Sequence, residues 1–332
     1  MERTMNIYDI AREAGVSIAT VSRVLNHKNT VSPATRARVE QVLAQHSYTP
    51  SAIARGLVSK SMRTVAILTV DIRFPHYANT AYTIEREFSH RGYDVLLCNT
   101  GGDRDTVLRY LRAVLKKQVD GIVLVGSVFN EICHGEEMRS LLCRVPIVLA
   151  NGKLDLPGAS SVLVDDRAGV ALAVDHLVSR GRRHLFYIQD KYTTSAEDKC
   201  AGFLQAMERA GLDPAGRVVR THDTLEDGMQ AARDILAGDL PCDAIVCGED
   251  LTAAGALKAL LRDGVAVPGQ VAVTGYNNSA YAYLCEPVLT TVDNKGEQAA
   301  QLCVQLLGSC IEKGGSAATV TIQPELVAGK TS

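Results

Sequence analysis

One short segment near the N-terminus constrains the fold of this chain more than any other. It spans residues 9–26 and reads DIAREAGVSIATVSRVLN. The spacing of Ala11, Gly15 and Val21 predicts two short helices joined by a tight turn, because alanine allows close approach, glycine accepts a positive φ and valine seals the pair. Ser17 is a favourable N-cap for the second helix. The segment therefore predicts a helix-turn-helix.

The second of these helices is expected to turn several side chains outward. These are Ile18, Ala19, Thr20, Ser22 and Arg23. An exposed isoleucine suits contact with a thymine methyl group, and arginine suits bidentate contact with guanine. Both side chains favour contact with DNA bases.

Charge is distributed unevenly along the 332 residues. The net charge is −2, but residues 1–60 hold eight Lys or Arg against four Asp or Glu, which leaves −6 for the remainder. A basic N-terminal module on an acidic body is expected when only one end of a protein meets phosphate.

Other functional classes find little support in the sequence. The nine cysteines contain no Cys-x-x-Cys pair, which favours free thiols in a reducing cytoplasm. There is no apolar leader and no apolar run of about 18 residues, so we expect no membrane segment. Phosphate-binding, nucleophile-elbow and zinc-protease motifs are absent, and the eight histidines lack metal-ligand spacing. We therefore expect no enzyme, no catalytic residue, no cofactor and no metal.

The N-terminal region is predicted to be helical over residues 6–46. A third helix begins at Ser32 and Pro33, an N-cap followed by a proline at the first helical position, and its apolar face holds Val39, Val42 and Leu43. Residues 50–58 form a shorter helical candidate. We expect it to form only when a partner orders it, because isolated helices under about 12–15 residues are marginal in water.

From residue 64 onward, short apolar strands alternate with helices. Strands are predicted at Thr64–Val70, Tyr93–Asn99, Gly121–Val125, Ile147–Ala150, Ser161–Val164, Leu185–Gln189, Ala244–Cys247, Val271–Gly275 and Val320–Gln323. Helices are predicted at Thr80–Arg91, Asp105–Lys117, Ala168–Arg180, Cys200–Ala210, Glu226–Ala237 and Leu251–Asp263. This alternation predicts two doubly wound α/β lobes, each with a parallel sheet covered on both faces. Ligands in such folds bind beyond the carboxyl ends of the strands, here between the lobes.

Several stretches together carry a resemblance to a known family. They are residues 9–26, VSPATR at 31–36, Tyr48 and Pro50 with AIARGL at 52–57, VTGYN at 273–277 and LTTV at 289–292. Residues 6–58 closely resemble the DNA-binding headpiece and hinge of the lactose-repressor/galactose-repressor (LacI/GalR) family. The remainder is similar to the periplasmic-binding-protein-like effector domain of that family, so the resemblance covers essentially the whole chain.

The resemblance implies a division of the chain into three parts. Residues 1–49 would form the DNA-binding headpiece, 50–63 the hinge helix and linker, and 64–332 the effector-binding and dimerisation domain. One lobe of that domain would hold residues 64–160 and 293–319, and the other 161–292 and 320–332.

Roles at the DNA are implied by the same resemblance. The matching positions are Ser17, Ile18, Ala19, Thr20, Ser22, Arg23, Asn26, Thr30, Ala54 and Leu57. Arg23 would read guanine in the major groove, and Ser22, Asn26 and Thr30 would contact phosphates. Leu57 would act as a wedge that opens a central base step from the minor groove.

Effector contacts are implied in the cleft between the lobes. The matching positions are Phe74, His76, Tyr77, Asn99, Ser127, Asn151, Ser195, Lys199, Glu249, Asp250, Asn277 and Asn278. Asp250 and Asn278 would hold sugar hydroxyls, although Asp250 could instead cap the helix predicted from Leu251. The chain departs from the family at Lys199, which stands where an arginine is frequent and loses its bidentate geometry.

Taken together, the residues and the resemblance predict a cytoplasmic, homodimeric, sequence-specific transcriptional repressor. It would bind a pseudo-palindromic operator on double-stranded DNA, and a small effector, a sugar or sugar phosphate, would control that binding. Two alternatives stay open at this point. One is a carbon-catabolite-type regulator controlled by a protein partner, and the other is a solute-binding receptor, a class that would not carry residues 6–58.

Overall fold

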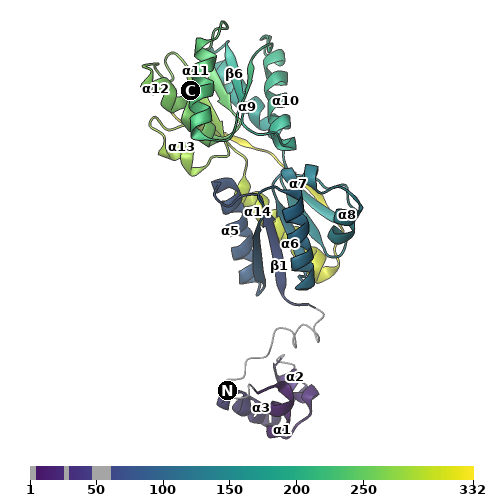
Figure 1. Cartoon of the computed structure of the whole chain (residues 1–332). Coiled ribbons are helices and arrows are strands. Elements are labelled where there is room, and N and C mark those ends of the chain that lie inside the picture. The colour runs from purple at the N-terminus through teal and green to yellow at the C-terminus, as the bar shows by residue number, and fades with distance from the viewer. Residues whose placement is uncertain (1–4, 26–29, 47–60) are drawn as a thin grey trace. The chain divides into compact units, whose positions relative to one another are not determined.

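The computed structural model describes residues 5–25, 30–46 and 61–332, and it divides into two compact units at residues 62 and 63. The two units are considered separately (Figure 1). The first contains the predicted helix-turn-helix. The second contains the two α/β lobes.

The N-terminal unit is built from three helices, which confirms the predicted pattern. They are α1 (Ile7–Glu13), α2 (Ile18–Leu25) and α3 (Pro33–Gln45). Gly15 adopts a φ of +61° in the turn, and the Ser17 hydroxyl accepts a hydrogen bond from the Thr20 amide at 3.2 Å. Ser32 caps α3, with Pro33 in the first turn. The side chains that close the three-helix core are Ile10, Ala11, Ala14, Val21, Val24, Val39 and Val42.

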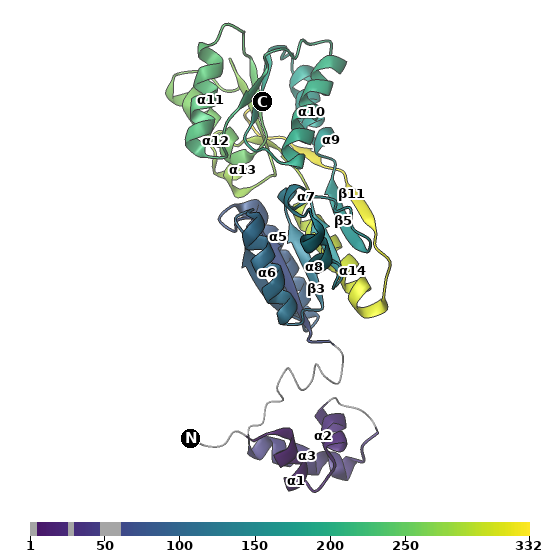
Figure 2. The ribbon, with the colours of Figure 1, turned by 45° about the vertical axis from the view of Figure 1, so that its right-hand side comes forward.

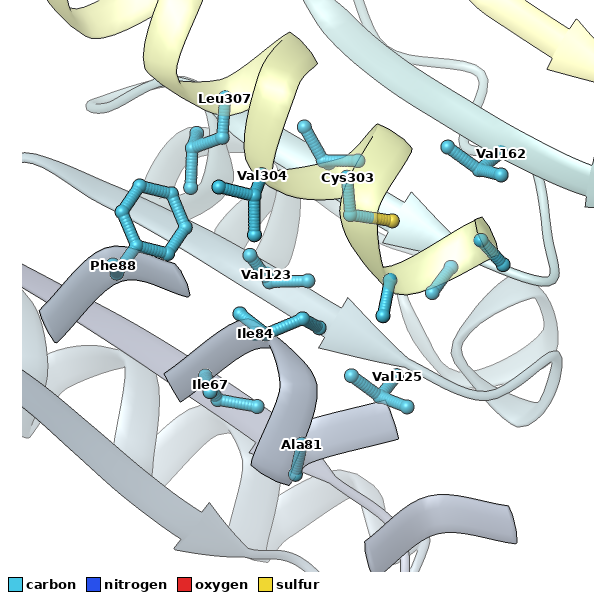
Figure 3. Close-up of a cluster of buried hydrophobic side chains, with 14 of the residues drawn as sticks. Ile67, Ala81, Ile84, Phe88, Val123, Val125, Val162, Cys303, Val304 and Leu307 are labelled. Atoms are coloured by element: carbon cyan, nitrogen blue, oxygen red, sulfur yellow. The ribbon is translucent and has the colours of Figure 1, made fainter. Parts of the chain in front are cut away.

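The first lobe is a six-stranded parallel sheet with helices on both faces. In spatial order its strands are β11 (Thr319–Ile322), β5 (Ala159–Val164), β4 (Ile147–Ala150), β3 (Gly121–Val125), β1 (Thr64–Thr69) and β2 (Asp94–Asn99). One face is covered by α5 (Pro75–His90) and α14 (Gly296–Lys313), where Phe88 and Leu307 pack over Val123 (Figure 3). The other face is covered by α6 (Arg104–Lys116), α7 (Val128–Ile132) and α8 (Glu136–Leu142).

The second lobe repeats this plan with one antiparallel edge strand. Its strands, in spatial order, are β12 (Glu325–Val327), β10 (Thr290–Asp293), β9 (Ala272–Tyr276), β8 (Ala244–Cys247), β6 (Leu185–Gln189) and β7 (Val218–Arg220). Only β12 runs antiparallel, against β10, among the described pairings of this sheet. The helices are α9 (Asp166–Ser179), α10 (Thr194–Arg209), α11 (Leu225–Ala237), α12 (Asp250–Arg262) and α13 (Ala280–Leu284).

The structure corrects the predicted division between the lobes. Residues 161–164 and 320–322 were expected in the second lobe, but β5 pairs with β4 and β11 pairs with β5, so both strands belong to the first sheet (Figure 2). The chain therefore crosses between lobes after Val164, Asp293 and Ile322. The pattern of strands in the sequence could not predict these crossings, because the alternation of strands and helices does not show which sheet a strand joins.

Candidate DNA-binding face and interlobe cleft

The outer face of α2 carries the side chains that the sequence assigns to DNA. Ile18 is 40% exposed, whereas Val21 and Val24 on the opposite face are 0% and 2% exposed. The exposed or half-buried residues of this group are Ser17, Ile18, Ala19, Thr20, Ser22, Arg23 and Thr30. Asn26, Ala54 and Leu57, which complete the predicted set, lie outside the described residues.

A cleft lies between the two lobes, where the carboxyl ends of both sheets face each other. Its walls are formed by His76, Tyr77, Gly126, Ser127, Asn151, Asp190, Lys191, Thr193, Ser195, Ala196, Lys199, Glu249 and Asn277. The cavity between these walls has a volume of about 30 Å³, which is room for about two water molecules. The lobes are thus closed on each other.

Eight of the twelve predicted effector residues lie in these walls. They are His76, Tyr77, Ser127, Asn151, Ser195, Lys199, Glu249 and Asn277. Phe74 lines a second cavity of about 20 Å³ beside the first. Asn278 faces a more open hollow that also contacts His76 and Asn277. These ten residues come together because each follows the carboxyl end of a strand or begins the next helix.

Two predicted effector residues do not line these cavities in the structure. Asn99 is absent from the cavity walls, and its side-chain oxygen accepts a hydrogen bond from the Ile72 amide at 2.9 Å. Asp250 is 1% exposed and accepts hydrogen bonds from the Ser279 amide at 2.6 Å and the Thr291 hydroxyl at 2.5 Å. Burial raises the pKa of Asp250 to about 7. Its carboxyl group ties together three segments of the second lobe and is not offered to the cleft.

Three further residues of the cleft wall were not predicted from the sequence. Asp190, Lys191 and Thr193 follow β6 directly and all line the cavity. Their position one to four residues beyond a predicted strand was the available signal, because the same rule found the other wall residues.

Lys191 occupies the middle of the cleft. Its Nζ atom lies 3.0 Å from Glu249 Oε1 and 3.7 Å from Asp223 Oδ2. It also lies 5.4 Å from the ring centre of Phe74 and 5.8 Å from that of Tyr77, both in the first lobe. Burial disfavours the charge of Lys191, but attraction to Glu249 outweighs it and raises the lysine pKa. Likewise, burial acts against the Glu249 carboxylate, but Lys191 and then Lys199 outweigh it and lower its pKa.

Lys199 belongs to the framework of the second lobe. Its ammonium donates to the Gly248 carbonyl at 2.9 Å and lies 4.0 Å from the ring centre of Tyr276. It also lies 3.9 Å from Glu249 Oε1. The side chain is only 7% exposed, so little of it reaches the cavity.

Direct hydrogen bonds also join the two lobes. The Asn151 amide donates to Ser195 Oγ at 3.4 Å, and Glu131 accepts from the Thr194 backbone amide at 2.8 Å. His76 Nδ1 lies 3.4 Å from Asn294 Nδ2 in the segment that crosses between the lobes. The closed arrangement therefore rests on polar contacts at the cleft mouth as well as on Lys191.

Comparisons with known proteins define the class. Residues 6–51 match the bacterial regulatory proteins of the lacI family, and residues 174–332 match a periplasmic binding protein-like domain. An HTH-type transcriptional regulator of Lachnoclostridium phytofermentans is 34% identical over 331 residues, 99% of each chain. The ribose operon repressor of Escherichia coli is 33% identical over 308 residues, 90% of this chain and 91% of that protein.

Solved structures agree on the fold. The lac repressor dimer bound to operator and the anti-inducer ONPF has a TM-score of 0.88 at 22% identity and covers 99% of each chain. The complex of the transcriptional regulator CelR with cellobiose has a TM-score of 0.71 at 26% identity and covers 99% of this chain and 100% of that one. A helix-turn-helix headpiece joined to a two-lobed body defines a DNA-binding transcriptional regulator. The chain belongs to the LacI family of these regulators.

Two further observations apply to the described part of the chain. None of its helices combines the length and apolar character that a membrane span requires. Within the same residues, no three His, Cys, Asp or Glu side chains are arranged to hold a metal ion.

The half-buried imidazole of His76 makes folding stability depend on pH. Burial lowers the pKa of His76 from 6.5 to about 4. Between these two pH values the unfolded chain is protonated at His76, whereas the folded protein is neutral there. The free energy of unfolding is therefore unaffected by His76 above pH 6.5 and decreases as the pH falls toward 4. Relative to His76→Gln, the wild-type protein should lose about 2 kcal/mol of unfolding free energy between pH 7.5 and pH 5. Urea unfolding of both proteins at each pH measures this difference, and a difference that stays constant would contradict the buried neutral state.

Proposed function

We propose that this protein is a cytoplasmic repressor that binds a pseudo-palindromic operator as a homodimer under the control of a small carbohydrate in the interlobe cleft. The observation that carries the DNA-binding part is the outer face of α2, where Ile18 and Arg23 are exposed while Val21 and Val24 seal the opposite face. The ribose operon repressor among the relatives supports repression.

A carbohydrate effector is supported by the chemistry of the cleft. Ser127, Asn151, Ser195 and Asn277 offer hydroxyl and amide groups from both lobes, next to the aromatic rings of Phe74 and Tyr77. Hydroxyls and amides pair with sugar hydroxyls, and apolar rings pack against sugar faces. The solved CelR complex holds cellobiose, which makes a sugar the first class to test. Neither a protein partner in place of the effector nor a solute receptor draws support from the relatives.

Dimer formation is supported by exposed apolar side chains on both lobes. In the second lobe, Leu284 is 80% exposed and lines a hollow of about 470 Å³, and the adjacent Tyr283 is 60% exposed. In the first lobe, Tyr82 on α5 and Leu97 on the edge strand β2 are 62% and 50% exposed. Apolar side chains clustered in this way mark contact surfaces in soluble proteins, and a second copy of the chain is the occupant we propose.

In the DNA complex, the two headpieces would each read one half-site. Residues 50–58, with Ala54 and Leu57, would form the hinge helix in the minor groove between them. Ordering each hinge residue costs about 1–2 kcal/mol, so contacts with DNA and with the twin hinge must offset that cost.

Replacing Arg23 tests the DNA-reading face. The full-length protein selects its operator from a random-sequence library, and affinities for that operator and for unrelated DNA are then measured. Arg23→Ala should weaken operator binding by roughly 5- to 150-fold, the equivalent of about 1–3 kcal/mol of base discrimination, with a much smaller effect on unrelated DNA. The control is Arg12→Ala, because Arg12 is exposed but pairs with Asp9 on α1 at 2.9 Å. Equal losses on both DNAs would remove the base-reading role.

Replacing Leu284 tests the dimer surface. Leu284→Asp places a charge in the proposed contact and should convert the dimer to monomer in sedimentation velocity. The matched control is Leu236→Asp on α11, where the side chain is 38% exposed but lies outside the hollow. A Leu284 variant that sediments like the wild-type protein would move the dimer contact elsewhere.

A further inference from the structure

The cleft contains a positive charge of the protein's own. The Lys191 side chain extends from the loop after β6, and its ammonium lies close to Glu249 and Asp223 and near the rings of Phe74 and Tyr77. Two cavities of about 30 and 20 Å³ both have Lys191 in their walls, together with His76, Glu249 and Asn277. The lysine side chain is therefore part of the wall that the two cavities share.

Aromatic rings and a carboxylate around an ammonium form a cation-binding site. A cation within about 6 Å of a ring centre is attracted by the negative face of the ring, and aromatic cages recognise ammonium ligands in this way. If Lys191 leaves, Glu249, Asp223 and Asp190 remain, and Lys199 is the ammonium that stays at the same carboxylate. The vacated space then carries excess negative charge.

Lys191 can leave the carboxylate by a movement of its side chain, without a rearrangement of its loop. Its backbone carbonyl accepts a hydrogen bond from the Gln189 amide at 3.1 Å, which holds the loop in place. The side chain is 21% exposed, so it already has a route to solvent. The neighbouring Tyr192 is 61% exposed, which places this loop at the surface.

We propose that the cleft takes an amine-bearing carbohydrate, whose ammonium group replaces that of Lys191 between Glu249 and the rings of Phe74 and Tyr77. This inference rests on the proposed function, since it specifies the effector of the same cleft. An exchange of one ammonium for another leaves Glu249 paired. A neutral sugar that displaced Lys191 would deprive a largely buried carboxylate of its nearest cation, which is costly.

The remaining wall groups fit the rest of such a ligand. Ser127 and Asn151 from the first lobe and Ser195 and Asn277 from the second can meet its hydroxyls. Because these groups come from both lobes, the ligand would hold the lobes together as Lys191 does in their closed arrangement.

The experiment uses the full-length protein, calorimetry and matched ligand pairs. The pairs are D-glucosamine with D-glucose, D-galactosamine with D-galactose, and n-propylammonium, which resembles the end of a lysine side chain, with 1-propanol. The variants are Lys191→Ala, Lys191→Ala combined with Glu249→Gln, and Lys116→Ala as a control, because Lys116 is exposed at the end of α6.

We expect an amine sugar to bind the wild-type protein at least tenfold more tightly than its neutral partner. Lys191→Ala should bind that amine sugar at least tenfold more tightly than wild type, because the internal competitor is gone, and it should also bind n-propylammonium but not 1-propanol. Lys116→Ala should match wild type. Adding Glu249→Gln should abolish the preference for the amine.

Two results would overturn the inference. One is equal or tighter binding of the neutral sugars, and the other is failure of folded Lys191→Ala, verified by its circular dichroism, to bind any of the amines. Operator affinity measured with each sugar separates this inference from the proposed function. Neutral sugars that bind more tightly than the amines and change operator affinity would support the proposed function and overturn the inference of an amine-bearing effector. Amines that bind without changing operator affinity would support the cation-binding site and overturn the proposal that the cleft ligand controls operator binding.

Discussion

The cleft between the two lobes is organised around one partly buried ion pair, whose lysine and glutamate side chains are 21% and 18% exposed. Lys191 in the second lobe meets Glu249 in the same lobe and reaches the rings of Phe74 and Tyr77 in the first. A buried charge is tolerated when it is paired and is strongly destabilising when its partner is removed. Whatever enters the cleft must therefore either leave this pair in place or supply a substitute for one of its members. That requirement narrows the chemistry of the ligand more than the shape of the cavity does.

The two sheets on either side of this pair are packed separately, so we expect movement at the cleft between them. Each sheet is covered on both faces by helices and has its own apolar cores. The contacts that join the lobes include hydrogen bonds of Asn151 with Ser195 and of Glu131 with Thr194. β1 begins at Thr64, directly after the N-terminal unit, so the chain connects that unit to the body through the first lobe.

Features that depend on neighbouring residues could be predicted from the sequence. Gly15 and Ser17 act through local backbone geometry, so the turn and the cap are as expected. The assignment of β11 to the first sheet could not be predicted, because it depends on pairing with β5, more than 150 residues away. For β5, the pattern of alternating strands and helices did not show that it pairs with β4. Edge strands β7 and β12 have only three residues each, too short for a clear period.

The candidate site likewise has features that the sequence predicts and features that it does not. Strand ends located most of the wall, but the sequence could not show that Asp250 would turn toward Ser279 and Thr291 and become buried. Nor could it show that Lys191 would fold back into the cleft, since a lysine in a loop is usually solvated. Both outcomes depend on contacts between segments that are distant in the sequence.

The central claim is that ligand binding in the cleft and operator binding by α2 are coupled. The most direct test is a closed thermodynamic cycle on the full-length protein. It measures the operator Kd with and without saturating ligand, and the ligand Kd with and without saturating operator. The account predicts that both change by the same factor, in the range of about 5- to 150-fold. A ligand that binds in the cleft and leaves the operator Kd unchanged would contradict it.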